Sequence, residues 1–146
     1  MDTQKIKQLL TLIANKSKSQ TDYGNTKKYI MEIIDYHDSI VSIDINDVRD
    51  LFQEGGAIHA FDVSVDALKA NRMNLAVDNI IRNAAHFEPY NHALVFFFFF
   101  PEKLPLRMEE LQPFSDWIES IPGEFMVKWG MATQSTQEIR AIVLLQ

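Results

Sequence analysis

Two carboxylates three residues apart are the side chains of this sequence best suited to chemistry. Asp44 and Asp47 lie in the run Ser42–Arg49, which reads Ser-Ile-Asp-Ile-Asn-Asp-Val-Arg. Carboxylates at this spacing can orient a water molecule or bind a magnesium ion. They can equally cap a helix, because Asp is a good N-cap and a carboxylate three residues later suits the capping-box position and the helix dipole. We favour helix capping for both residues.

No other pattern predicts a catalytic, cofactor or metal site. The sequence contains no cysteine, which excludes a thiol enzyme and zinc-thiolate ligands. It also lacks a Gly-x-Ser-x-Gly nucleophile motif. The histidines are too scattered for a metal motif such as His-Glu-x-x-His; they are His37, His59, His86 and His92. We therefore assign no catalytic, cofactor-binding or metal-binding residue and predict that the chain is not an enzyme.

A run of phenylalanines marks the predicted core. Residues 93–100 are all apolar, and Phe96 to Phe100 are consecutive phenylalanines. Successive residues of a strand point to opposite faces, so no more than three of these rings can share one face. This favours a strand buried on both faces over an aromatic platform for stacking nucleobases. The run is also far too short to span a bilayer, which needs about 20 residues as a helix.

Hydrophobic periodicity predicts alternating helices and strands around this run. Helices are expected at residues 3–15, 26–36, 45–54, 65–85 and 108–121, and strands at 57–63, 92–100, 125–132 and 138–145. Residues 15–25 are expected to form a linker, and Gly55-Gly56 to end the third helix. The helices at 65–85 and 108–121 can cover only one face of the resulting sheet. The other face therefore needs the N-terminal helices or another subunit.

Composition and charge limit the class of partner. The 146 residues include 47% hydrophobic and 23% charged residues, as in ordinary soluble domains. Residues 1–40 contain six Lys against five Asp or Glu, a balance of +1, and the rest contain eight Lys or Arg against fifteen Asp or Glu, a balance of −7. An acidic body disfavours nucleic acid, which needs a clustered basic face. We expect no membrane segment, no signal peptide and a cytoplasmic location.

Several short runs resemble the FtsZ/tubulin family. Ser42–Arg49 resembles that family's Asn-x-Asp-x-x-Asp-Val-Arg loop, with Ser42 in place of the Asn. Residues 106–111 resemble the Leu-Arg-Leu-Asp-Glu-Phe opening of its last helix, and residues 127–130 its Val-x-x-Gly strand. The spacing of Arg72, Ala76 and Ile81 is similar to that of its middle helix. The resemblance covers about residues 29–146 and corresponds to the family's C-terminal domain.

This resemblance implies an α+β fold in which a four-stranded sheet carries helices. We expect a helical segment at residues 1–38 that packs on a C-terminal-domain-like unit at residues 39–146. The family's nucleotide is bound by a separate domain with a Gly-rich loop, and neither that loop nor a GxxxxGK[ST] run occurs here. The resemblance therefore implies a stand-alone domain without a nucleotide site.

The function expected from this combination is a non-catalytic protein-interaction or assembly module. Its partner would be the protein itself, as a homo-oligomer, or a filament-forming GTPase, contacted through the sheet edge or residues 39–50. In the family, the two loop carboxylates reach the nucleotide of a neighbouring subunit. One alternative is therefore an activator that supplies Asp44 and Asp47 in trans to a partner GTPase.

A second alternative belongs to another functional class. The same broad architecture occurs in trimeric chorismate-mutase-like folds, whose sites lie between subunits. The chain would then be a small-molecule binder or enzyme with an interfacial pocket lined by arginine and carboxylate side chains.

Overall fold

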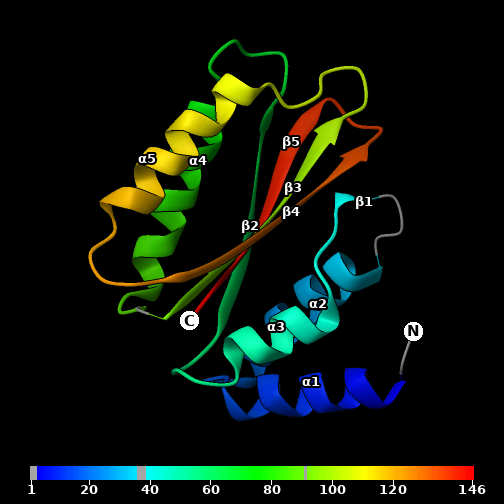
Figure 1. The fold of residues 1–146 in the computed structure, drawn as a ribbon, viewed down its shortest axis with the longest axis vertical. Helices are drawn as coiled ribbons and strands as arrows, with labels where there is room; N and C mark the ends of the chain where they lie inside the picture. The colour runs from blue at the N-terminus through cyan, green and yellow to red at the C-terminus, as the bar shows by residue number, and fades with distance from the viewer. Residues whose placement is uncertain (1–2, 36–38, 91) are drawn as a thin grey trace.

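The computed structural model describes residues 3–35, 39–90 and 92–146. Helices and strands follow one another in the order α1 (Thr3–Asn15), α2 (Gln20–Asp35), β1 (Ser39–Val41), α3 (Ile45–Phe52), β2 (His59–Asp66), α4 (Arg72–Ala84), η1 (Ala85–Phe87), β3 (Ala93–Pro101), η2 (Met108–Leu111), α5 (Gln112–Ser120), β4 (Met126–Gln134) and β5 (Glu138–Leu145), where η marks a 3-10 helix. Figure 1 shows a sheet with α4 and α5 on one face and α1, α2 and α3 on the other. The predicted α+β class is confirmed.

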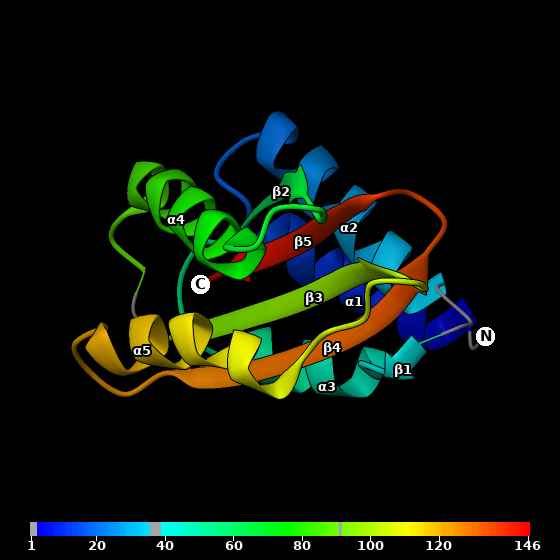
Figure 2. The same cartoon turned by 90° about the horizontal axis from the view of Figure 1, so that it is seen from above.

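The sheet differs from the prediction by one strand. Within the described residues it has five strands in the order β1-β4-β3-β5-β2, visible from above in Figure 2. β3 and β4 are parallel, and the other neighbouring pairs are antiparallel. The strand missing from the prediction is β1, which pairs Ser39 with Ala132 and Val41 with Met131. Its three residues are too few for periodicity to reveal it.

Strand β3 supplies both halves of the core, as the phenylalanine run predicted. Its residues are all buried. Phe97 and Phe99 pack with residues of α1, α2 and α3, whereas Phe96, Phe98 and Phe100 pack with α4 and α5. The N-terminal helices thus cover the second face of the sheet. The division into a segment at residues 1–38 and a domain at 39–146 stays a prediction.

A polar cluster attaches α2 to the sheet. The Arg140 guanidinium of β5 donates to both carboxylate oxygens of Glu32 in α2, and its Nε donates to Asp62 Oδ2 of β2 at 3.0 Å. Tyr29 of α2 donates its hydroxyl to Asp62 Oδ1 at 2.9 Å. Burial and then this hydrogen bond raise the pKa of Tyr29 to about 12. Charged and apolar contacts together fix α2 on this face.

Two predicted boundaries are wrong, and each error has a physical cause. α2 begins at Gln20 instead of residue 26. The Ser19 hydroxyl accepts a hydrogen bond from the Asp22 backbone N–H at 3.1 Å and so caps the start of the helix. The helix therefore begins inside the polar stretch that was expected to be a linker. The helix predicted from residue 65 begins at Arg72, because β2 continues to Asp66 and a turn follows. Leu68 lies on that turn instead of in the predicted helix and is 64% exposed.

Candidate functional site

Asp44 occupies the N-cap of α3, as its sequence position predicted. Its backbone is extended, with φ −82° and ψ 145°, and its Oδ1 accepts a hydrogen bond from the Asn46 backbone N–H at 3.2 Å. The Val48 backbone N–H donates to the Asp44 carbonyl at 3.2 Å and closes the first helical turn. A cap of this kind satisfies a backbone donor that the helix itself cannot pair.

Asp47 lies in the first turn of α3, where a carboxylate complements the helix dipole. Both Asp44 and Asp47 are exposed. The next charged residue, Arg49, contacts Gln8 Oε1 of α1 at 3.4 Å and Asp50 Oδ1 at 3.4 Å. A cavity of about 390 Å³ beside Arg49 is lined by Gln8, Leu12, Arg49, Asp50 and Gln53, and so by neither predicted aspartate. Asp44 and Asp47 thus share one exposed helix start rather than a pocket.

Capping by Asp44 gives a testable result. Asn caps nearly as well as Asp, so Asp44→Asn should leave the melting temperature almost unchanged, whereas Asp44→Ala should lose about 0.5–2 kcal/mol of stability. Thermal and urea unfolding of the two variants beside the wild type measures both effects. Equal losses for Asn and Ala would mean that the charge, rather than the cap geometry, stabilises α3.

The described histidines form no metal site. His59 is buried and stacks on Phe87 with ring centroids 4.9 Å apart, and burial lowers its pKa. The Nε2 of His92 lies 3.2 Å from the Leu51 carbonyl oxygen. His86 is exposed, and His37 lies outside the described residues. Among the described residues no group of three or more His, Asp or Glu side chains could hold a metal ion.

Sequence reasoning missed a buried ion pair on the other face of the sheet. Arg72 at the start of α4 is 4% exposed and Glu110 of η2 is 7% exposed. Arg72 Nε donates to Glu110 Oε2 and Arg72 Nη2 to Glu110 Oε1, both at 2.7 Å. The same guanidinium donates to the Leu104 and Pro105 carbonyls at 2.9 and 2.8 Å. Arg72 thereby fixes the segment between β3 and η2 against α4.

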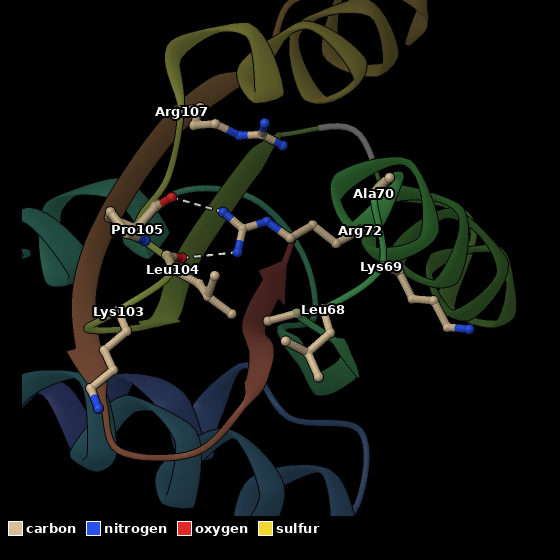
Figure 3. A pocket seen from close by; sticks show the side chains of 9 residues that line it. Leu68, Lys69, Ala70, Arg72, Lys103, Leu104, Pro105 and Arg107 are labelled. Atoms are coloured by element: carbon tan, nitrogen blue, oxygen red, sulfur yellow. Dashed lines mark hydrogen bonds between the residues drawn. The ribbon is translucent and has the colours of Figure 1, made fainter.

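An open cavity of about 420 Å³ lies over this pair, between the turn after β2 and the segment after β3 (Figure 3). Four of its lining residues are cationic, namely Lys69, Arg72, Lys103 and Arg107. The others are apolar, namely Ala67, Leu68, Ala70, Leu104 and Pro105. We call this group of residues the basic pocket. β2 and β3 are both antiparallel to β5, so they run in the same direction and deliver their following loops to one end of the sheet. The pocket therefore depends on the strand order, and hydrophobic periodicity in the sequence does not reveal strand order.

The fold is similar to solved structures of FtsZ and TubZ. A mutant FtsZ from M. jannaschii has a TM-score of 0.63 at 18% sequence identity, over 84% of this chain and 37% of that chain. An empty FtsZ dimer from the same organism has a TM-score of 0.60 at 17% identity, over 84% of this chain and 36% of that chain. TubZ from Bacillus thuringiensis serovar israelensis, solved as GDP-form protofilaments, has a TM-score of 0.59 at 8% identity, over 99% of this chain and 42% of that chain.

These similarities confirm the predicted FtsZ/tubulin-like fold. The chain spans less than half the length of each of these structures, at identities that show the fold alone. No protein-family model matches the sequence, and no curated protein matches it. No helix in the described ranges is long and apolar enough to cross a membrane.

Proposed function

We propose that these residues form a non-catalytic, cytoplasmic protein-interaction or assembly module that has no nucleotide site of its own. The proposal rests on one combination: an FtsZ/tubulin-like fold in a sequence without a Gly-rich phosphate loop. The only adjacent glycines are Gly55 and Gly56. Gly55 has φ +101°, and a Cβ there would lie 2.8 Å from the Gln146 side chain, so this glycine serves the turn after α3.

The proposed interaction surface consists of the β1–β4 edge of the sheet and the segment of residues 39–50 that includes β1. Ile40 of β1 is 60% exposed and Trp129 of β4 is 38% exposed. β1 pairs with β4 only near Ala132, so the first half of β4 has β3 as its one strand neighbour among the described residues. Exposed apolar side chains beside an open strand edge are features of a surface that binds another protein.

Self-association through this edge can be tested with one charge substitution. The wild type is expected to sediment as a homo-oligomer, or to co-sediment with a filament-forming GTPase. Ile40→Asp should abolish either behaviour, because it places a charge in an apolar contact. Ile81→Asp is a matched control, since Ile81 is an exposed isoleucine of α4 and lies outside this edge. A monomer that binds no such GTPase would contradict the proposal, as would an assembly unaffected by Ile40→Asp.

The absence of a phosphate loop predicts that the chain binds neither GTP nor GDP measurably. Calorimetric titration of the purified protein with each nucleotide in the presence of magnesium is the measurement. A dissociation constant in the low micromolar range would contradict this expectation and require a site with a different design.

A second candidate function is activation of a partner GTPase in trans. Asp44 and Asp47 are both exposed at the start of α3, and the α3 cap uses Asp44 Oδ1. GTP turnover by the partner should then rise when this protein is added, and the rise should disappear with Asp44→Asn although that variant folds normally. An unchanged rise with Asp44→Asn would exclude a chemical role for this carboxylate.

A further inference from the structure

The basic pocket carries positive charge on an acidic protein. The chain has a formal net charge of −6, yet the charged residues that line this pocket are Lys69, Arg72, Lys103 and Arg107. Glu110 lies behind the pocket and neutralises Arg72 through two hydrogen bonds of 2.7 Å. Arg107 also pairs with Glu109 and Glu110, so Lys69 and Lys103 supply the excess positive charge of the pocket. An anionic partner repelled by most of the surface would be attracted at this place.

The arrangement of these cations suits an extended partner better than a small anion. In Figure 3, Lys69 and Lys103 lie on opposite sides of the pocket, and their ammonium groups point away from Arg72. Arg107 lies at a third side, with its Nε 3.4 Å from Glu110 Oε1 and 3.9 Å from Glu109 Oε1. A single phosphate needs donors that converge on one point. Separated cations instead match several carboxylates spaced along a chain.

Apolar side chains accompany the charges. Leu68 is 64% exposed and lies at the pocket, and Met108, which follows Arg107 in sequence, is 79% exposed. Leu68 sits on an ordered turn, because its backbone N–H donates to Asp66 Oδ1 at 2.9 Å and the Ala67 N–H donates to the Gln137 carbonyl at 3.0 Å. The hydrogen bond from the Leu68 N–H also orients the Asp66 carboxylate toward the backbone of this turn. An ordered, exposed leucine would gain contacts when another apolar side chain covers it.

We propose that the basic pocket binds an acidic segment of a partner protein in which glutamate or aspartate residues alternate with apolar ones. The carboxylates pair with Lys69, Lys103 and Arg107, and an apolar side chain of the segment packs on Leu68 and Leu104. This surface belongs to the α4 and α5 side of the sheet, opposite α3 (Figure 1). It is therefore independent of the carboxylates of α3.

The probe for this site is a fluorescein-labelled synthetic peptide in which Glu and Leu alternate, titrated with the full chain by fluorescence anisotropy. Lys103→Glu and Lys69→Glu should each weaken binding about tenfold, and Leu68→Ser by a smaller factor. Lys27→Glu is the matched control, because Lys27 is an exposed lysine of α2 and the charge change is the same. It should leave the affinity unchanged. Raising the salt concentration should weaken wild-type binding.

Two outcomes would overturn the proposal directly. They are the absence of peptide binding and an equal loss of affinity in the Lys27→Glu control. A peptide with Gln in place of Glu must bind far more weakly, and inorganic phosphate must not compete at the same concentration as the peptide. If phosphatidylserine vesicles bind the wild type but not Lys103→Glu, and the peptide does not bind, the proposal is wrong and the surface binds membranes.

NMR spectroscopy can locate the bound peptide. Amide shifts on peptide addition should cluster at residues 67–72 and 103–107, and shifts confined elsewhere would exclude this pocket.

Discussion

Truncation of Phe98 to alanine is expected to remove about 3–5 kcal/mol of stability. Phe98 is 2% exposed at the centre of β3, and its ring contacts the Phe114 ring edge-on with centroids 5.5 Å apart. The rings of Phe96 and Phe100 flank it with centroids at 6.4 and 6.1 Å. Alanine would leave a cavity between strand and helix that β3 cannot close, because its other face is packed with residues of α1, α2 and α3. The loss is large beside the total of about 5–15 kcal/mol typical of a domain.

Guanidinium unfolding followed by circular dichroism measures this loss, and two variants calibrate it. Phe98→Leu keeps most of the volume and should cost less than Phe98→Ala. Met108→Ala removes an apolar side chain that is 79% exposed and should change stability by no more than about 0.5 kcal/mol. A loss below about 1 kcal/mol for Phe98→Ala would mean that this face of β3 is accessible. An aromatic binding platform would then be the better interpretation.

The core was predictable from sequence because the relevant signal is local. The apolar run at 93–100 has no polar position, so a strand buried on both faces follows from the alternation of side chains alone. The need for a second covering layer follows in turn. α1 and α2 provide that layer through residues such as Ile13, Ile30 and Ile33. Asp44 was placed at its N-cap by equally local reasoning.

Features that depend on distant residues, or on a side-chain hydrogen bond to the backbone, were not predictable. β1 exists because Ser39 and Val41 meet a strand about 90 residues later in the chain, and three residues have no periodicity of their own. Leu68 fits a helical stripe in sequence, but the Asp66 side chain forms a turn that shifts the start of α4 to Arg72. In both cases tertiary or side-chain hydrogen bonds outweigh the periodic pattern.

The basic pocket belongs to the same category. Its lining comes from two loops that become neighbours only when β2 and β3 take their places on either side of β5. The pair of Arg72 and Glu110 is separated by 38 residues. The family resemblance included both residues without indicating that they contact each other. One sequence by itself offers no other sign of such a contact.

Removal of the Glu110 carboxylate should have an effect as large as the loss of Phe98. Glu110→Ala leaves the Arg72 guanidinium buried with two carbonyl acceptors and no counter-charge, an arrangement that typically costs about 3–5 kcal/mol. The double variant Arg72→Met with Glu110→Leu removes both charges and should cost less than Glu110→Ala alone. Urea unfolding of these variants near neutral pH gives the comparison. Equal losses for the single and double variants would mean that packing, not charge, dominates here.

The same pair predicts how stability depends on pH. The hydrogen bonds from Arg72 lower the pKa of Glu110 from 4.5 to about 2, so the folded state binds this proton less tightly than the unfolded chain. The resulting stabilisation, about 3 kcal/mol, is fully present above the unfolded pKa and is lost progressively as the pH falls from about 4.5 to about 2. Glu110→Gln has no carboxyl group to titrate, so its stability lacks this pH-dependent contribution. The stability difference between wild type and Glu110→Gln should therefore shrink across that window. A difference that stays constant throughout the window would mean that Glu110 keeps an ordinary pKa and that Arg72 does not hold it as a carboxylate.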